Sequence, residues 1–269
     1  MTVGITESVA AQLAEFNAVP RVQDLYEGDG AAFYDRLVGS DRSEVREVLA
    51  LARSAGGAVL DLAAGSGRLA IPLVRCGTRV TAVDLSADML SRLEGEIAGN
   101  PLLDCVVADM RSFALERRYE LIIIGATSIT LLDAKDRIAM YASVREHLAE
   151  GGIFALTIAG TSSGAHLRVT EDQRFTVDGP DGAEEYLYSQ QIVDDGTARV
   201  VNWARAADFV RNGTVTVLTS RLRVLDADIL RAELVQAGFT DPRVYPVRAN
   251  AGSDIVLLET SLRGEHRSA

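Results

Sequence analysis

The sequence contains few cysteines and almost no lysine. Its 269 residues include two cysteines, Cys76 and Cys105, and neither lies in the spacing of a metal-binding motif. Two cysteines do not make a disulfide framework, so we expect two buried or half-buried free thiols in a reducing compartment. Lys135 is the only lysine among 27 basic residues, and the arginines are scattered rather than clustered. The three histidines are far apart in the sequence and therefore indicate no metal cluster.

Positive charge and long apolar segments are also scarce. The chain has 27 basic and 38 acidic residues, a net charge of −11, so a basic surface for nucleic acid phosphates is not expected. An anionic membrane surface would repel the same chain. No apolar run approaches the roughly 18 residues of a membrane-spanning helix, and the acidic N-terminus does not fit a secretory signal. We expect a cytoplasmic protein with no nucleic acid or membrane partner.

The length fits one large domain, or one domain with a subdomain. Hydrophobic residues make up 48% and charged residues 24%, which is typical of a globular protein and argues against disorder. The pattern of elements predicts five regions: an N-terminal helical cap segment at 1–54, an α/β core at 55–160, an antiparallel lid or interface insertion at 161–224, completion of the core sheet at 225–260, and a tail at 261–269.

Strands and helices alternate through the core region. Short β-branched runs are expected as strands at 58–62, 79–83, 104–108, 120–124 and 153–158, with helices between them. Continuous apolar strands separated by helices are typical of a parallel sheet covered on both faces. Asp41 and Glu44 read as a capping box for a helix over 41–53, and Asp133 caps a helix that closes at Gly151-Gly152.

The pattern changes after residue 160. Turn signals at Asp178-Gly-Pro-Asp-Gly, Asp194-Asp-Gly and Asn212-Gly divide residues 168–224 into an antiparallel meander of three or four strands. A helix over about 226–237 and two antiparallel strands at 243–247 and 254–259 follow. We therefore expect an α/β fold with a doubly wound, seven-stranded, mostly parallel sheet and an inserted antiparallel β-meander.

One turn carries most of the functional information. The segment VLDLAAGSGRLA at 59–70 places glycines between a strand and a helix, where a ligand can approach the backbone closely. Gly65-x-Gly67-x-x-Ala70 matches the dinucleotide-binding fingerprint. However, Asp61 closes the strand before the glycines, and its carboxylate would repel a pyrophosphate and suit a positively charged ligand. Asp84 ends the next strand, where it can bind both ribose hydroxyls, and Asp109 ends the third at the same sheet edge.

Four blocks of the sequence together resemble the class I S-adenosylmethionine-dependent methyltransferases. They are VLDLAAGSGR at 59–68, VTAVDLSADML at 80–90, VADMRSF at 107–113 and LAEGGIFAL at 148–156. The resemblance implies a Rossmann-like fold with S-adenosyl-L-methionine as cofactor. Ala63 stands where the family usually has its first glycine.

The resemblance also implies roles for individual residues of the cofactor site. Asp61 and the turn backbone would hold the methionine end, Asp84 the ribose, and Asp109 the adenine amino group. The full set of cofactor-binding residues implied in this way is Asp61, Ala63, Gly65, Gly67, Asp84, Leu85, Asp109, Met110 and Ala126.

Within that family, the chain looks most like the actinobacterial amine N-methyltransferases. The stretch YEGDGAAFYDRL at 26–37 and the meander after the fifth strand carry this likeness. Overall similarity further suggests the methyltransferase of daptide-type ribosomal peptide biosynthesis, a natural product pathway in which an amine at the peptide C-terminus is dimethylated. The predicted function is therefore (di)methylation of a primary amine on a small molecule or peptide.

An amine acceptor requires groups that bind a cation, such as carboxylates and aromatic rings. Tyr34 and His166 are candidate catalytic residues, and Tyr26, Tyr34, His166 and Trp203 are candidate substrate-binding residues. Phe33, Asp35, Tyr186 and Tyr188 lie in the same two regions. Each has a purely structural alternative: a packed tyrosine, a solvated loop histidine or a tryptophan in the core of the meander.

Other functions stay open at the sequence level. An O-methyltransferase for a hydroxylated metabolite would need a base or a metal near the hydroxyl. A nicotinamide-dependent dehydrogenase shares the ribose-binding acid but not Asp61, and a non-catalytic module could retain only the nucleotide pocket. A homodimer built through the 161–224 insertion is a further alternative. The sequence does not determine the acceptor, the number of methyl groups or the need for a general base.

Overall fold

The computed structural model describes residues 4–38, 41–179, 182–211, 213–247 and 254–264. The chain divides into two compact units. Unit 1 comprises residues 1–40 and 165–224, and unit 2 comprises residues 41–164 and 225–269. Each unit contains its own sheet, with a hydrophobic cluster on each face of that sheet. Within the described residues, no helix is long and apolar enough to cross a membrane.

Unit 2 is a seven-stranded sheet in the order β11-β12-β6-β5-β2-β3-β4. Strands β2 to β6 pair in parallel with one another, β12 pairs antiparallel with β6, and β11 and β12 pair antiparallel, as predicted. The elements of this unit are α3 (Val45–Ala55), β2 (Val59–Leu62), α4 (Ala70–Arg75), β3 (Val80–Asp84), α5 (Ala87–Glu96), β4 (Leu103–Val107), β5 (Tyr119–Ile124), η1 (Ser128–Leu131), α6 (Ala134–His147), β6 (Leu148–Ala159), α9 (Ala227–Gln236), β11 (Arg243–Val247) and β12 (Ile255–Thr260).

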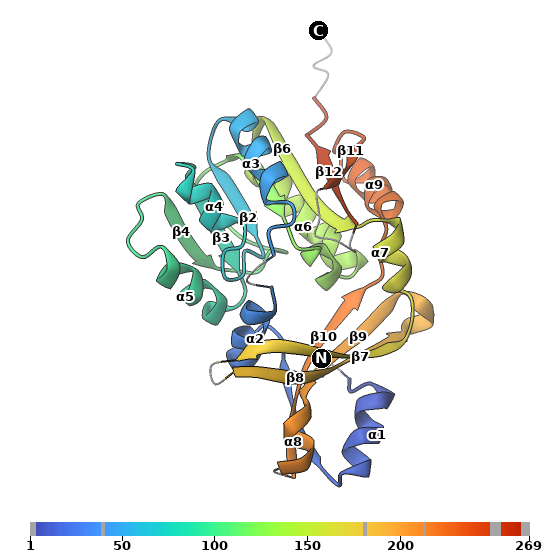
Figure 1. Ribbon diagram of the computed structural model, residues 1–269. Helices are drawn as coiled ribbons and strands as arrows, with labels where there is room; N and C mark the ends of the chain where they lie inside the picture. Colours follow the sequence, from blue (N-terminus) through green and yellow to red (C-terminus); the bar gives the residue numbers. More distant parts are fainter. Residues whose placement is uncertain (1–3, 39–40, 180–181, 212, 248–253, 265–269) are drawn as a thin grey trace. The chain divides into compact units, whose positions relative to one another are not determined.

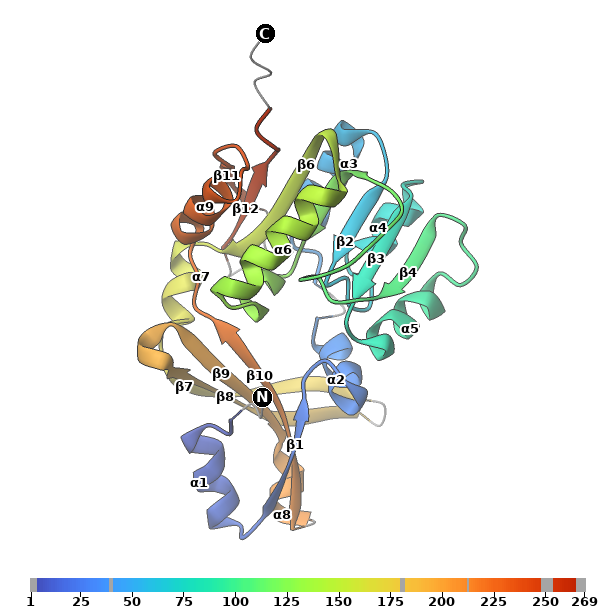
Figure 2. The same ribbon diagram turned by 180° about the vertical axis from the view of Figure 1, so that it is seen from behind.

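Alternation along the central strands builds two cores in unit 2. In β5, Leu121 and Ile123 point to one face and Ile122 and Ile124 to the other, and all four are fully buried. Helices α3, α4 and α5 cover the first face, while α6 and α9 cover the second (Figures 1 and 2). The continuous apolar runs seen in the sequence thus belong to strands buried on both sides.

Unit 1 is a five-stranded sheet in the order β1-β10-β9-β8-β7. Its elements are α1 (Glu7–Glu15), β1 (Val19–Asp24), α2 (Gly28–Val38), β7 (Glu171–Gly179), β8 (Gly182–Val193), η2 (Asp194–Gly196), β9 (Ala198–Arg205), α8 (Ala206–Arg211) and β10 (Thr214–Arg223). Helix α7 (Thr161–His166) spans the boundary between the units. Strands β7 to β10 form the predicted antiparallel meander, and β1 pairs in parallel with β10. The predicted N-terminal helical segment did not include this strand.

The two faces of the unit 1 sheet carry different clusters. Helix α1 packs its buried Val9 and Leu13 against one face. The other face carries an aromatic cluster, which we define by Phe33 of α2, Tyr186 and Tyr188 of β8, and Trp203 of β9. Because side chains alternate along each strand, one face of the sheet carries a mainly aliphatic cluster and the other carries the aromatic cluster.

Several local predictions are wrong. Asp41 and Glu44 do not form a capping box: Glu44 precedes α3 with φ of 61° and makes no cap hydrogen bond with its side chain. Helix α6 ends at His147, so Gly151-Gly152 lies inside β6 rather than closing the helix. Asn212 lies outside the described residues, and α8 occupies the connection between β9 and β10 in place of a two-residue turn. Cys76 is exposed, whereas Cys105 is half-buried.

Candidate functional site

Three acidic residues mark the carboxyl edge of the unit 2 sheet. Asp61 lies in β2, Asp84 ends β3, and Asp109 follows β4, and these three strands are parallel neighbours. Asp61 and Asp84 are close enough for the Asp84 charge to raise the pKa of Asp61. The structure thus brings together the acids that the sequence placed at one edge, where ligands of open α/β sheets bind.

Asp61 is a buried carboxylate with an unsatisfied oxygen. The residue is 2% exposed, and within the described residues its Oδ2 atom has no hydrogen-bond partner. Burial raises the pKa of Asp61 from 3.8 to about 7, against the opposing effect of the Arg68 guanidinium, while Glu44 and Asp84 raise it further. An unpaired buried carboxylate costs free energy, and a cationic ligand group with N–H donors would remove that cost.

The turn after β2 has the backbone conformation that a ligand-cradling loop requires. Ala63, Gly65 and Gly67 have φ of 56°, 56° and 94°, so all three are in the left-handed region. A Cβ atom at Gly65 would have no protein atom within 4 Å, whereas one at Gly67 would collide with Leu93 of α5. Gly67 therefore permits packing against α5, and Gly65 leaves open space beside the turn.

Asp84 fixes the turn and the start of α5 at the same time. Its Oδ2 accepts a hydrogen bond from the Gly65 backbone N–H at 2.8 Å, and its Oδ1 accepts one from the Ser86 N–H at 2.8 Å. Burial raises the pKa of Asp84 although these hydrogen bonds oppose the rise. Leu85, the next residue, is 70% exposed.

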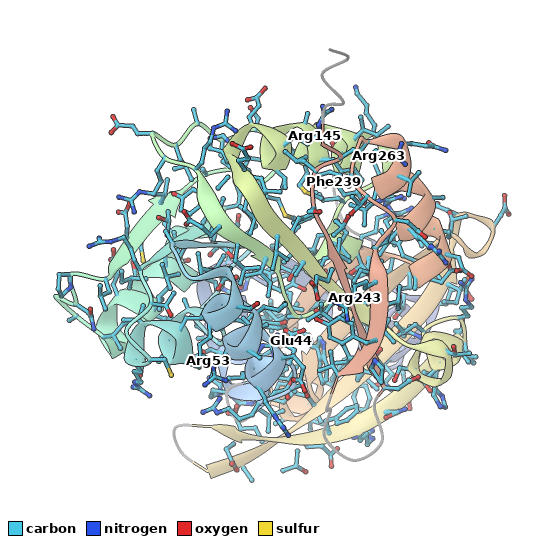
Figure 3. All side chains as sticks on the ribbon, turned by 90° about the horizontal axis from the view of Figure 1, so that it is seen from above. Glu44, Arg53, Arg145, Phe239, Arg243 and Arg263 are labelled. Carbon is cyan, nitrogen blue, oxygen red and sulfur yellow. The ribbon has the colours of Figure 1, made fainter. Side chains whose placement is uncertain are left out.

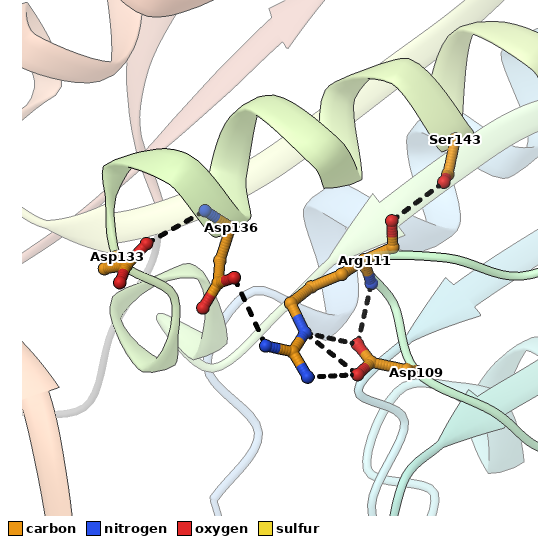
Figure 4. Close-up of polar contacts among 5 residues, drawn as sticks. All are labelled: Asp109, Arg111, Asp133, Asp136 and Ser143. Atoms are coloured by element: carbon orange, nitrogen blue, oxygen red, sulfur yellow. Dashed lines mark hydrogen bonds and ion pairs between the residues drawn. The ribbon is translucent and has the colours of Figure 1, made fainter.

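Asp109 is held by an arginine that the sequence analysis did not single out. Arg111 donates from Nε to both Asp109 oxygens, at 3.0 and 2.9 Å, and from Nη2 to Oδ2 at 2.5 Å (Figure 4). Arg111 Nη1 also donates to Asp136 of α6 at 3.2 Å. These contacts lower the pKa of Asp109, so the carboxylate stays ionised. Met110, between them, is half-buried and packs against the core on the α6 face.

The turn after β5 contains Ala126, the last predicted cofactor residue. Ala126 and Thr127 both lie in the left-handed region, with φ of 53° and 58°. The Ala126 backbone N–H donates to Oε1 of Glu44 at 2.7 Å, across 82 residues of sequence. Glu44 is fully buried, and sequence reasoning missed it because Glu44 resembled an ordinary helix cap.

The candidate acceptor-binding residues lie in unit 1. The rings of Tyr26 and Tyr34 meet edge to face, 5.0 Å between centroids, and both pack against the aromatic cluster. Trp203 is buried in that cluster, with 4.8 Å between its ring centroid and that of Tyr188. Burial raises the pKa of Tyr26 well above its usual value, so its hydroxyl stays protonated.

His166 is exposed at the C-terminal end of α7. Its backbone carbonyl accepts a hydrogen bond from Gln190 Nε2 at 3.1 Å, and Gln190 Oε1 accepts one from the Tyr188 hydroxyl at 2.9 Å. A side chain of β8 thus connects the end of α7 to the aromatic cluster.

Comparison with known proteins finds a family match within unit 2. Residues 59–152 match a family described as a methyltransferase domain. A curated relative, the putative methyltransferase YqeM of Bacillus subtilis, is 31% identical over 104 residues. That match covers 38% of this chain and 42% of the relative, so it spans less than half of either protein.

Solved structures match over nearly the whole chain. The glycopeptide N-methyltransferase MtfA in complex with S-adenosyl-L-homocysteine is 29% identical, covers 97% of this chain and 99% of its own, and has a TM-score of 0.65. MtfA has also been solved with S-adenosyl-L-methionine and with sinefungin. The CcbJ methyltransferase from Streptomyces caelestis, at 23% identity and a TM-score of 0.67, covers 82% of this chain and 90% of its own and shares the fold.

Proposed function

We propose that this S-adenosylmethionine-dependent methyltransferase transfers its methyl group to an amine nitrogen of a small-molecule or peptide acceptor. The sequence predicted methyl transfer with S-adenosylmethionine as cofactor, and the family match and the MtfA complexes support both predictions. The observation that carries the choice of nitrogen is the likeness to MtfA, a glycopeptide N-methyltransferase, over 97% of this chain. This likeness extends through both units, including the meander where the acceptor candidates lie.

The acidic edge of unit 2 fits the cofactor group by group. The unsatisfied Asp61 Oδ2 would accept from the methionine ammonium, together with the Ala126 carbonyl. Asp84 would accept from the ribose hydroxyls, and the open space beside Gly65 leaves room for the ligand against the turn. Exposed Leu85 would lie against the adenine, and Asp109 would accept from its amino group.

When bound, S-adenosylmethionine supplies a methyl group already activated on a sulfonium. Asp61 and the Ala126 carbonyl would hold the methionine end and Asp84 the ribose. A deprotonated acceptor nitrogen would take the methyl group with its lone pair, and the electrons of the carbon–sulfur bond would stay on sulfur. The protein mainly orients the partners, a contribution of roughly 7–11 kcal/mol in well-aligned reactions. A covalent role for a side chain is not required.

The acceptor must lose its proton before it attacks. For an amine with a pKa of about 10.4, that deprotonation costs roughly 4.6 kcal/mol at neutral pH. Burial or a neighbouring amide lowers the cost, and a general base lowers it further. We assign substrate binding to Tyr26, Tyr34 and Trp203, whose rings suit a cationic amine. His166 is the candidate to accept the proton, and Tyr34 is the other candidate catalytic residue.

A finer proposal concerns the acceptor itself. The likeness to daptide-type enzymes predicts dimethylation of an amine installed at the C-terminus of a ribosomal peptide. Recognition of a peptide would agree with the glycopeptide named for MtfA. The proposal therefore predicts that a peptide ending in an amine is a better acceptor than a free small amine.

The test uses purified protein, methyl-labelled S-adenosylmethionine and matched acceptors. The set contains a short peptide ending in an amine, the same peptide ending in a hydroxyl, and the same peptide ending in a carboxylate. The proposal predicts one or two methyl groups on the amine-ended peptide, located on nitrogen by fragmentation mass spectrometry. Methylation of the hydroxyl-ended peptide instead would establish an O-methyltransferase. Cofactor binding without transfer to any amine in a wider panel would contradict catalysis on nitrogen.

A further inference from the structure

Glu44 is a buried charge placed directly before helix α3. Figure 3 labels it together with Arg53, which lies near the other end of the helix. Its side chain is fully buried, and its backbone has φ of 61°, a left-handed conformation that a glutamate rarely adopts. Such strain persists where surrounding contacts impose it, and it is concentrated at functional sites. The contacts of Glu44 therefore need an explanation beyond capping a helix.

One carboxylate oxygen of Glu44 is fully used. Oε1 accepts from the Ala126 backbone N–H at 2.7 Å and from Arg68 Nη2, with which Glu44 forms an ion pair. A Cβ atom on Gly125 would lie 2.7 Å from the same oxygen, so the glycine allows the carboxylate to sit against the turn after β5. Glu44 thus holds the strained turn whose Ala126 carbonyl is proposed to face the cofactor.

The other oxygen of Glu44 is unsatisfied. Among the residues described, Oε2 has no hydrogen-bond partner, and the same is true of Asp61 Oδ2. Glu44 is close enough to Asp61 to raise its pKa, and Arg68 acts on Asp61 in the opposite direction. The Arg68 guanidinium acts on both Glu44 and Asp61 and also pairs with Asp41, so negative charge is in excess when both buried acids are ionised. Two orphaned acceptor atoms and an excess negative charge describe a site for a cation with several N–H donors.

We propose that Glu44 is a second carboxylate of the pocket that binds the primary ammonium of the cofactor's methionine moiety. Oε2 accepts from the ammonium beside Asp61, while Oε1 fixes the Ala126 turn. This inference rests on the proposed use of S-adenosylmethionine but not on the identity of the methyl acceptor. Arg68 favours the ionised form of Asp61, since its charge lowers the pKa of that carboxyl.

The test compares two ligands that differ at the proposed contact. S-Adenosylhomocysteine carries the ammonium, and 5′-methylthioadenosine has the same nucleoside and a thioether but lacks the amino acid. Their dissociation constants are measured by calorimetry, without acceptor, for the wild type, for Glu44→Gln and for the matched surface control Glu96→Gln, which is exposed on α5. Glutamine keeps an oxygen for the Ala126 N–H but removes the charge.

The proposal predicts that Glu44→Gln weakens S-adenosylhomocysteine about ten- to a hundredfold and leaves 5′-methylthioadenosine within about threefold. The control variant should bind both ligands like the wild type. Equal weakening of both ligands would show that Glu44 serves only the structure, and no weakening of either would also overturn the proposal. Failure of every protein, wild type included, to bind either ligand would instead contradict the proposed cofactor.

A second variant keeps the inference testable if Glu44→Gln is unstable. Glu44→Asp keeps the negative charge but places it on a side chain that is one methylene shorter. The ratio of the two dissociation constants refers only to folded protein, so it does not depend on stability. A charge contact predicts that the aspartate variant keeps more of the preference for S-adenosylhomocysteine than the glutamine variant does. A packing role predicts the reverse, because glutamine matches the shape of glutamate.

Discussion

Replacing Asp61 by asparagine should make the ligand-free protein more stable and the cofactor complex weaker. The wild-type carboxyl is 2% exposed, has an unsatisfied Oδ2, and has its pKa raised from 3.8 to about 7 mainly by burial. A raised carboxyl pKa means that the folded state binds the proton more tightly than the unfolded state does. The ionised Asp61 therefore destabilises the fold, and the asparagine variant lacks that cost.

The size of this destabilisation, and the pH range over which it develops, follow from the pKa values of Asp61 in the unfolded and folded states. The shift from 3.8 to about 7 corresponds to a cost of about 4 kcal/mol when it is complete. The cost is absent below pH 3.8, grows as pH rises, and is complete above about pH 7. Because the new amide also needs a hydrogen-bond partner, we expect a net gain of about 2 kcal/mol at pH 8. That gain raises the melting temperature by roughly 4–8 °C.

The assay is thermal unfolding of the ligand-free proteins at pH 8 and pH 5, with calorimetric binding of S-adenosylhomocysteine at pH 8. Asp61→Asn should melt higher than the wild type at pH 8, with a smaller difference at pH 5. The same variant should bind about ten- to a hundredfold more weakly, because a charge-assisted hydrogen bond to the ammonium is lost. Asp172→Asn, at an exposed position of β7, is the matched control. A variant that melts lower at pH 8 and binds like the wild type would refute the reasoning.

Other predictions concern the same edge of the sheet. Ala63→Gly relieves a left-handed φ of 56° and should raise the free energy of unfolding by up to ~1 kcal/mol in denaturant titration; a loss of stability would contradict the strain. Gly67→Ala should destabilise the protein by about 1–3 kcal/mol, since its Cβ would collide with a leucine side chain of α5. Gly65→Ala should cost only about 1 kcal/mol in stability but weaken binding of S-adenosylhomocysteine at least tenfold, because its Cβ enters the open space beside the turn. If the two glycine variants had equal effects on folding and on binding, the assignment of Gly67 to packing and Gly65 to the ligand would be refuted. Arg111→Ala removes the cation that lowers the pKa of Asp109, so the loss of S-adenosylhomocysteine affinity on acidification should begin at higher pH than in the wild type; an unchanged pH profile would count against this link.

The unit 2 core could be predicted because its signals are local. Each of β2, β3 and β5 is a mainly apolar run bounded by a turn, and most of its residues are buried, as expected of a parallel sheet. The acidic residues at the strand ends needed only the rule that parallel strands share a carboxyl edge. The doubly wound sheet and its inserted meander are confirmed by the topology and by the solved structures.

The features that were missed depend on contacts distant in sequence. Strand β1 is mostly exposed and has no alternating apolar pattern. Its residues Val19 to Asp24 nevertheless pair in parallel with β10, which lies almost 200 residues later in the sequence, from Thr214 to Thr219 in this pairing. Glu44 looked like a helix cap because Asp41 precedes it by three residues, but its partners are Arg68 and Ala126. No local pattern predicts a contact made across 82 residues.

Arg111 was missed for a different reason. It lies two residues after Asp109 in one of the blocks that carry the family resemblance, but a surface arginine in a loop usually has no specific role. In the structure, its guanidinium holds both Asp109 oxygens and also contacts Asp136 at the start of α6. An acid and a base two residues apart at a sheet edge is the sequence signal that could have identified it.

The most direct test of the account measures binding of S-adenosylhomocysteine to the Asp84→Ala protein. Asp84 accepts hydrogen bonds from the Gly65 and Ser86 backbone and is proposed to hold the ribose. The account predicts at least about a hundredfold loss of affinity by calorimetry, while Asp172→Ala binds like the wild type. If the Asp84→Ala protein binds S-adenosylhomocysteine at full strength, the cofactor does not occupy this edge of the sheet.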